Sequence, residues 1–220
     1  STAPSSHQAG NSIPFDPSDR ILLVGEGDFS FAASLVEHHA CHNLTATSLD
    51  TRTELLAKYA PQAEEHIRAL EEAGQTVLHN VDATKLERNK AVIKAAAAAA
   101  AGNHGEAAAH GFDKILFNFP HIGGKSTDVN RQVRANQELL VSFFASCTSN
   151  TSPPLLAPRS GQILITLFDG APYTLWNIRD LARHSGLEVE RSFKFDAGLY
   201  PGYRHARTLG NLVGEGGWRG

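Results

Sequence analysis

The sequence predicts an α/β fold built on a parallel sheet, and three observations support this prediction. Short, largely apolar segments alternate along the chain with stretches that have a helical pattern, the first of these segments, Ile21–Val24, contains no polar residue, and capping residues flank several of the helical stretches. We expect strands at Ile21–Val24, Leu44–Leu49, Thr76–His79, Lys114–Phe119, Gln162–Phe168 and Leu187–Phe195. We expect helices at Phe31–His39, Thr53–Ala73, Lys85–Ala101, Val129–Ser149 and Thr174–Ser185.

Composition divides the chain into three parts. Residues 1–19 are rich in Ser, Pro and Gly without an apolar period and are expected to form an arm, residues 20–210 one domain, and residues 211–220 a Gly-rich tail. The chain has 41% apolar and 20% charged residues, which is typical of a single globular domain. Its two cysteines exclude a disulfide framework, and we expect neither a membrane span nor a metal site.

Charge is uneven along the chain although the net charge is only −3. Residues 1–158 hold 12 basic and 17 acidic side chains, a net charge of −5, whereas residues 159–220 hold 8 and 6, a net charge of +2. A polyanion such as RNA is therefore expected to contact the C-terminal third.

A glycine turn follows the first predicted strand directly and leads into the first predicted helix. This is the place where α/β sheets bind nucleotides, because the first glycine permits the tight turn and the second lets a ligand approach backbone amides at a helix start. The third glycine of the dinucleotide motif is missing, which weakens the signal. The residues expected to bind a nucleoside cofactor here are Gly25, Glu26, Gly27, Asp28, Phe29, Ser30 and Phe31.

Acidic residues follow the next two predicted strands. Asp50 lies 23 residues after Gly27, where a carboxylate accepts hydrogen bonds from ribose hydroxyls, and Asp82 can serve an adenine amino group in the same way. The alternative is that both residues only cap the helices that follow them. Their common position at strand ends favours the cofactor.

Four ordered motifs give the chain a resemblance to a known family. The segment Asn118–His121 is similar to the Asn-Pro-Pro-aromatic box of S-adenosylmethionine-dependent methyltransferases that modify nitrogen, with Phe119 in place of the first proline. More narrowly, the chain resembles the large-subunit rRNA uridine-N3 methyltransferase domain. The motifs that carry this resemblance are Ile21–Leu35, Phe112–Lys125, Thr166–Ala182 and Phe195–Gly210.

The resemblance implies a Rossmann-like sheet of seven strands, the last antiparallel, with helices on both faces. It implies S-adenosylmethionine at the carboxyl ends of the first two strands, wrapped by Gly25–Phe31, with Asp50 on the ribose and Asp82 on the adenine. Asn118 and Phe119 then line the floor between cofactor and target base. The implied partner is large-subunit rRNA or a pre-ribosomal particle, the implied location is the nucleus and nucleolus, and the domain is expected to act as a monomer.

Methylation of uracil N3 requires removal of its proton, because the nitrogen lone pair is otherwise tied into the ring. The candidate bases are Asp169, at the end of the fifth predicted strand, and His121, beside the box. Asp169 is equally suited to fixing a turn, and His121 to stacking on the base. Asn118 and the backbone of Pro120 are expected to offer carbonyl acceptors, and Phe119 or Phe168 to stack the flipped base unless both belong to the core.

An aromatic and basic cluster near the C-terminus is suited to looped RNA. Tyr200, Tyr203, Arg204 and Arg207 combine rings for stacking with cations for phosphates, and Lys125 is expected to extend this surface. The alternative is a rigid turn with its arginines in solvent.

Two other functions remain open at this point. One is a non-catalytic cofactor-binding factor for ribosome assembly, and the other is a methyltransferase for transfer RNA. A nicotinamide-dependent reductase is disfavoured because the third glycine and a Tyr-x-x-x-Lys pair are absent.

Overall fold

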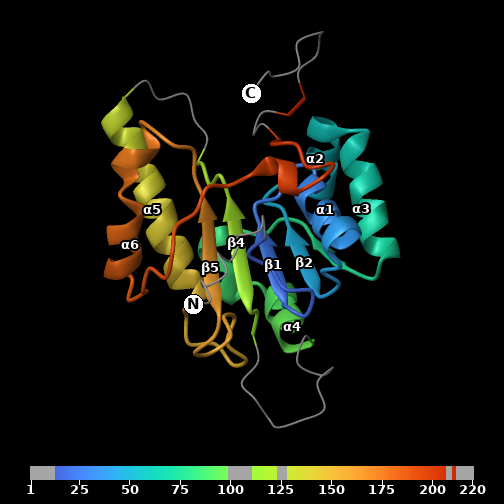
Figure 1. The fold of residues 1–220 in the computed structure, drawn as a ribbon, viewed down its shortest axis with the longest axis horizontal. Helices are drawn as coiled ribbons and strands as arrows, with labels where there is room; N and C mark the ends of the chain where they lie inside the picture. Colours follow the sequence, from blue (N-terminus) through green and yellow to red (C-terminus); the bar gives the residue numbers. More distant parts are fainter. Residues whose placement is uncertain (1–12, 99–110, 123–127, 207–209, 212–220) are drawn as a thin grey trace, which may run out of the picture.

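A computed structural model describes residues 13–98, 111–122, 128–206 and 210–211. Within these residues the chain forms one five-stranded sheet in the order β3-β2-β1-β4-β5, parallel throughout (Figure 1). The strands are β1 (Ile21–Val24), β2 (Leu44–Thr47), β3 (Thr76–Leu78), β4 (Lys114–Asn118) and β5 (Gln162–Thr166). The predicted α/β fold with a parallel sheet is therefore confirmed, and it is consistent with a Rossmann-like fold.

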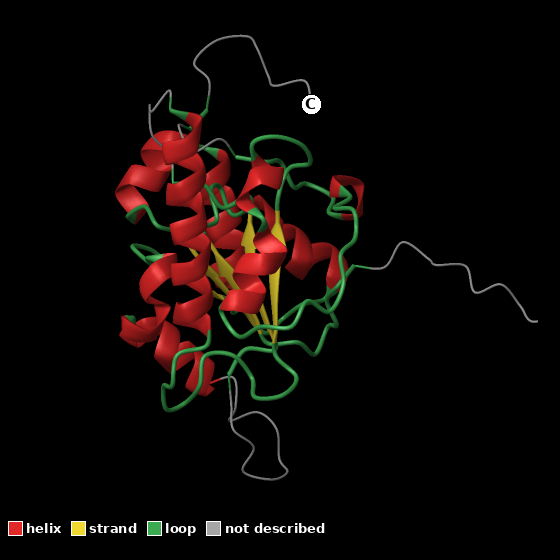
Figure 2. Cartoon of the chain, turned by 90° about the vertical axis from the view of Figure 1, so that its left-hand side faces the viewer, coloured by secondary structure: helices red, strands yellow, loops and turns green. Residues whose placement is uncertain are grey.

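Helices cover both faces of this sheet, as the alternation of side chains along β1 requires (Figure 2). Ile21 and Leu23 pack into one core with α1 (Ser30–His39) and α3 (Gln62–Glu72). Leu22 and Val24 pack into a second core on the opposite face. That second core includes residues of the 3₁₀ segment η1 (Ala83–Arg88), α4 (Lys90–Ala98) and α5 (Val129–Cys147).

Three predicted helices are interrupted for local reasons. Pro61 lacks the N–H that a continuous helix needs, so the predicted helix Thr53–Ala73 divides into α2 (Arg52–Tyr59) and α3. Asn89 leaves the helical region and its side chain accepts from the N–H groups of Ala91 and Val92, which separates η1 from α4. Asn177 adopts a left-handed conformation (φ 51°) between the 3₁₀ segment η2 (Tyr173–Trp176) and α6 (Ile178–His184).

The predicted strand Leu187–Phe195 does not form in this structure. The segment has no ladder with any strand, and the described residues contain five strands. A cavity of about 2040 Å³ is lined by β5 and by this segment. The sequence of Leu187–Phe195 has the composition of a strand, but a strand also requires a neighbouring strand for its backbone hydrogen bonds. This segment does not pair with β5.

The first and last segments of the domain lie at opposite edges of the sheet. At the amino ends of the strands, Arg20 binds Asp113 through two hydrogen bonds, Nε to Oδ2 at 2.8 Å and Nη2 to Oδ1 at 2.9 Å. At the carboxyl ends, the segment Tyr200–Ala206, which follows the 3₁₀ turn η3 (Ala197–Leu199), crosses above the arrowheads of the strands (red in Figure 1). This segment therefore lies over the edge where the predicted site residues gather.

Candidate functional site

The carboxyl edge of the sheet brings together the residues that the sequence singles out. The glycine loop follows β1, Asp50 and Asp82 follow β2 and β3, and Asn118 is the last residue of β4. Because β1 lies between β2 and β4, the connections after β1 and β4 leave in opposite directions along the sheet. Ligands of open α/β sheets bind at such a switch point.

The glycine loop depends on its first glycine for shape. Gly25 has a φ of +71°, and a Cβ at this position would lie 2.6 Å from the ring of Phe117, so only glycine fits. The loop is tied to β2 by a hydrogen bond from the N–H of Glu26 to the carbonyl of Thr47 (2.8 Å). Asp28 accepts from the N–H of Ser30 at the start of α1. Gly27 faces the chain itself, since a Cβ there would lie 2.5 Å from the Cβ of Ala206.

Glu26 brings a carboxyl group with an unusual environment into this loop. Burial raises its pKa to about 8, and the negative charge of Asp28 acts in the same direction, against a hydrogen bond from the N–H of Ala32 (3.3 Å). Two neighbouring carboxyl groups in one loop favour a cationic ligand, whose charge would reverse the rise in pKa.

The two acidic residues after β2 and β3 have local partners. Both carboxylate oxygens of Asp50 accept from Nζ of Lys58 on α2, each at 2.8 Å. Asp82 accepts from the N–H and hydroxyl of Thr84 and pairs with Lys85, so it caps η1. The capping alternative is therefore realised at Asp82, whereas Asp50 is paired with a lysine eight residues away.

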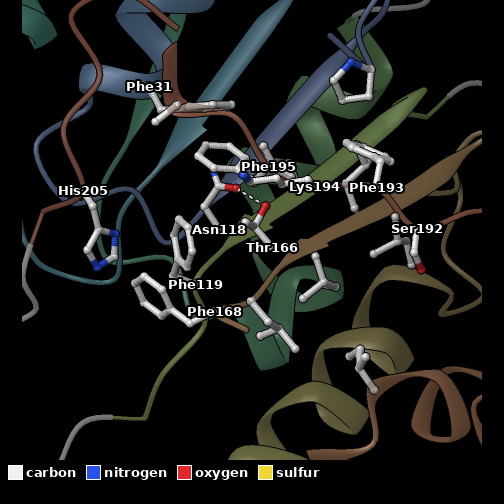
Figure 3. A pocket seen from close by; sticks show the side chains of 18 of the residues that line it. Phe31, Asn118, Phe119, Thr166, Phe168, Ser192, Phe193, Lys194, Phe195 and His205 are labelled. Carbon is white, nitrogen blue, oxygen red and sulfur yellow. Dashed lines mark hydrogen bonds between the residues drawn. The ribbon is translucent and has the colours of Figure 1, made fainter. Parts of the chain in front are cut away.

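Asn118 leaves one polar atom without a partner. Its Oδ1 accepts from the hydroxyl of Thr166 on β5 at 2.6 Å (dashed line in Figure 3). Its Nδ2 is buried and has no hydrogen-bond partner among the residues that the structure describes. The sequence predicts that Asn118 is a carbonyl acceptor, and Thr166 uses one of the two lone pairs of that oxygen. Asn118 also presents an N–H donor, and a buried donor without a partner costs about 1–3 kcal/mol unless a ligand accepts from it.

Beside Asn118 lies a cluster of aromatic rings, which we call the aromatic cluster: Phe119, Phe168, Tyr173 and His205. The ring centroids of Phe119 and Phe168 are 4.4 Å apart (Figure 3). Phe119 has a φ of 50°, a conformation that costs a side-chain-bearing residue roughly 1–2 kcal/mol. Phe168 is 36% exposed, so part of its side chain remains accessible from solvent.

The other predicted catalytic residues lie next to this cluster in the chain, and Asp169 lines the same cavity as Asn118. Asp169 is exposed and its Oδ1 accepts from the N–H of Gly170, which is the turn alternative. His121 is also exposed, with its ring centroid 6.5 Å from that of Trp176. Pro120 is buried after β4.

The predicted RNA-binding residues also divide. Tyr200 is only 4% exposed and packs against Phe31 and Phe195, so its ring belongs to the core and does not face RNA. Tyr203 contacts the edge of Phe31 and is half-buried, and burial raises its pKa. Arg204 is exposed. Lys125 and Arg207 lie outside the described residues.

Three residues of this region were not expected from the sequence, namely Lys58, Thr166 and His205. Lys58 is the second-last residue of α2, which begins at a capping box formed by Thr51 and Glu54, and its Nζ donates to the carboxylate of Asp50, just before that box. Thr166 is paired with Asn118 in the β4–β5 ladder. The sequence carried a signal only for His205, which lies inside the aromatic and basic cluster.

Across the described ranges, no group of three or more His, Cys, Asp or Glu side chains is placed to hold a metal ion. Among the same residues, no helix is long and apolar enough to cross a membrane.

Comparison with known proteins identifies the family. A family model described as "rRNA (uridine-N3-)-methyltransferase BTM5-like" matches residues 22–207. The chain belongs to this family. It is 33% identical to the 25S rRNA (uridine(2634)-N(3))-methyltransferase of Saccharomyces cerevisiae, over 90% of this chain and 69% of that protein. The expected activity, methylation of N3 of uridine in ribosomal RNA, is confirmed by this membership.

Other relatives are longer than this chain. It is 31% identical to "Heavy metal-associated isoprenylated plant protein 41" of Arabidopsis thaliana, over 91% of this chain and 36% of that protein. It is 32% identical to "Ferredoxin-fold anticodon-binding domain-containing protein 1 homolog" of Mus musculus, over 84% of this chain and 27% of that protein. The shared region is thus a domain that occurs in proteins of different total length.

Proposed function

We propose that the chain uses S-adenosylmethionine to methylate N3 of a uridine in large-subunit rRNA, with the cofactor and the base meeting between the glycine loop and Asn118. The observation that carries this proposal is the buried Nδ2 of Asn118, a donor without a partner at the carboxyl end of β4. Uracil offers carbonyl acceptors on both sides of N3, so a base held at this position satisfies that donor.

The residues at this edge fit the cofactor by charge. S-adenosylmethionine carries a sulfonium and an ammonium group, and the glycine loop supplies the carboxyl groups of Glu26 and Asp28. Asp50 would accept from the ribose hydroxyls, for which its carboxylate has capacity beyond the bonds from Lys58, and Asp82 would lie nearer the adenine. The bound cofactor supplies an electrophilic methyl group.

The chain's own residues then have three tasks. Thr166 fixes the carboxamide of Asn118, and Asn118 donates to a uracil carbonyl oxygen. The exposed face of Phe168 stacks the flipped base, which is worth about 1–3 kcal/mol per base. Holding both reactants in line lowers the barrier, because orientation replaces a bimolecular encounter.

Several finer expectations belong to the same proposal. We propose that residues 20–210 form the methyltransferase domain and that the complete fold has a sheet of seven strands. We also propose that the domain acts as a monomer and has a nucleolar role in ribosome biogenesis. Arg204, Arg207 and Lys125 remain the proposed RNA contacts.

The proposal is tested by incubating the purified protein with S-adenosylmethionine and large-subunit rRNA and mapping methylated uridines by mass spectrometry. We expect 3-methyluridine in the large-subunit rRNA and none in a transfer RNA control. Methyl transfer to transfer RNA alone would show that the substrate is transfer RNA. Cofactor binding without methyl transfer to either RNA would support the non-catalytic alternative.

A further inference from the structure

The segment that carries His205 is fastened to the glycine loop. The hydroxyl of Ser30 accepts from the N–H of Arg204 (3.2 Å) and lies 3.3 Å from the Arg204 carbonyl, to which it donates. On the other side of His205, Ala206 closes against Gly27. The residues before and after His205 are therefore both fixed to the loop that is proposed to bind the cofactor.

The imidazole of His205 turns toward the end of β4 and β5. Its ring centroid lies 4.7 Å from that of Phe119 and 5.4 Å from that of Phe168, at interplanar angles of 71° and 90°. Figure 3 shows the three rings grouped together next to Asn118. Within the described residues, neither ring nitrogen of His205 has a hydrogen-bond partner, although the residue lines the cavity.

This placement differs from that of the two bases expected from the sequence. All three side chains are exposed, and Asp169 lines the same cavity as His205. The imidazole of His205 contacts the rings of Phe119 and Phe168, whereas the Oδ1 of Asp169 accepts from the N–H of Gly170 and the ring of His121 lies 6.5 Å from that of Trp176. His205 reaches the same cluster from the opposite direction, through a segment that the sequence places more than thirty residues after β5.

We propose that His205 is the general base that removes the proton from uridine N3, an assignment that rests on the function proposed above. A ring nitrogen of neutral His205 takes the N3 proton and becomes imidazolium. The N3 electron pair forms the new bond to the methyl carbon, and the bond from that carbon to sulfur breaks with its electron pair going to sulfur, which leaves a neutral thioether. His205 then releases the proton to solvent.

The charge environment agrees with this role. Desolvation by the surrounding side chains lowers the pKa of His205 below its usual value of 6.5, and Asp28 in the glycine loop partly opposes this. The rings that contact the imidazole are Phe119, directly after β4, and Phe168, two residues after β5; the next residue, Asp169, lines the same cavity, and Arg204 precedes His205 in the chain. The imidazole is therefore neutral at pH 7 and able to accept a proton.

The first experiment measures single-turnover methyl transfer to large-subunit rRNA between pH 5.5 and 9.5. For the parent we expect the rate to rise as His205 loses its proton, with a midpoint below pH 6.5, and then to level off. For His205→Gln we expect a rate at pH 7 lower by about 10²–10⁴-fold, which then increases with pH as uracil loses its proton unaided. In His205→Ala, added imidazole should restore part of the rate. His42→Gln, an exposed histidine just before β2 at the opposite edge, is the matched control.

The second experiment has a readout that does not depend on activity. Imidazole resonances of the parent are followed by NMR as a function of pH, and the signal that is missing in His205→Gln is assigned to His205. We expect it to titrate below 6.5 in the absence of cofactor, and calorimetry should show equal affinity of parent and variant for S-adenosylmethionine.

The outcomes separate the two proposals. If the parent does not methylate uridine, the proposed function and this assignment both fail. If the parent is active and His205→Gln keeps its rate and pH profile, only the base assignment is overturned. The same holds if His205 stays protonated at pH 7, or if Asp169→Asn rather than His205→Gln produces the alkaline shift.

Discussion

The two halves of the carboxyl edge of the sheet differ in whether their polar side chains have hydrogen-bond partners. On the side of β1, β2 and β3 the acidic groups have partners within the chain, as with Asp50 on Lys58 and Asp82 on Thr84. On the side of β4 and β5 the polar groups Asn118 and His205 lie among aromatic rings, and the Nδ2 of Asn118 has no partner. A cofactor on the first side adds hydrogen bonds to carboxylates that already have partners, whereas a base on the second side satisfies an open donor.

This difference predicts that changes on the β4–β5 side affect the rate and that changes on the β2–β3 side affect cofactor affinity. The predictions below are ordered from the largest expected effect to the smallest. Each can contradict this difference between the two sides of the sheet.

The largest effect is expected at Asn118. Asn118→Ala removes the donor to the uracil carbonyl, and loss of one such donor typically lowers the rate about 10²–10³-fold. Single-turnover assays should show this loss while calorimetry shows unchanged affinity for S-adenosylmethionine. Thr166→Val, which releases Oδ1 of Asn118 but keeps its donor, should lower the rate much less. A large loss of cofactor affinity in Asn118→Ala would contradict the division.

A smaller effect, on affinity rather than rate, is expected at Asp50. Asp50→Ala removes an acceptor for the ribose hydroxyls, and loss of a charged hydrogen bond costs about 1.5–3 kcal/mol, or roughly ten- to a hundredfold in the dissociation constant. Calorimetry with S-adenosylmethionine measures it. Lys58→Met breaks the same ion pair but keeps the carboxylate. If Lys58→Met weakens binding as strongly as Asp50→Ala, the ion pair and not a ribose contact is responsible.

A several-fold effect on RNA affinity is expected at Arg204. Its backbone holds Ser30 and its side chain is exposed, so Arg204→Ala leaves the fastening of the segment intact. RNA affinity should fall, and the slope of log affinity against log salt should become shallower by about one unit. Lys94→Ala, on α4 near the amino ends of the strands, is the control (Figure 1). Equal slopes for parent and Arg204→Ala would place the RNA elsewhere.

The smallest effect concerns stability at the opposite edge of the sheet. Burial alone raises the pKa of Asp113, but hydrogen bonds from the guanidinium and N–H of Arg20 outweigh it, so its pKa lies below the usual 3.8. Its stabilising contribution is therefore present above pH 3.8 and is lost as the pH falls through the lower, folded-state pKa. Asp113→Asn should reduce the free energy of unfolding at pH 7 by about 1 kcal/mol, since the pair is partly screened by solvent.

Urea unfolding of parent and Asp113→Asn between pH 7 and pH 3 measures this, and the difference between them should shrink at the acidic end. Glu72→Gln removes an exposed pair with Arg68 and should change little. Unchanged activity in Asp113→Asn is expected, because this pair lies away from the carboxyl edge.

The sequence was most informative where one local rule decides the structure. The glycine turn needs Gly25 because a Cβ at this position would lie 2.6 Å from the ring of Phe117, and the buried strands are recognisable because parallel strands are apolar on both faces. It was misleading where a pattern has two outcomes. Asp82 follows β3 and caps η1, Tyr200 lies in an aromatic and basic segment but packs in the core, and Leu187–Phe195 has no partner strand.

By itself the sequence determined the α/β class, the five strands of the described sheet, the glycine loop at their carboxyl edge and, through its motifs, the methyltransferase family. Only the tertiary structure decided which polar groups are satisfied and which remain open. Lys58 reaches Asp50 because α2 packs back toward the end of β2, and Thr166 occupies Oδ1 of Asn118 because β5 pairs with β4. His205 reaches Phe119 because its segment crosses the sheet. These contacts join residues whose partners are set by packing in space, and no local periodicity in a sequence encodes them.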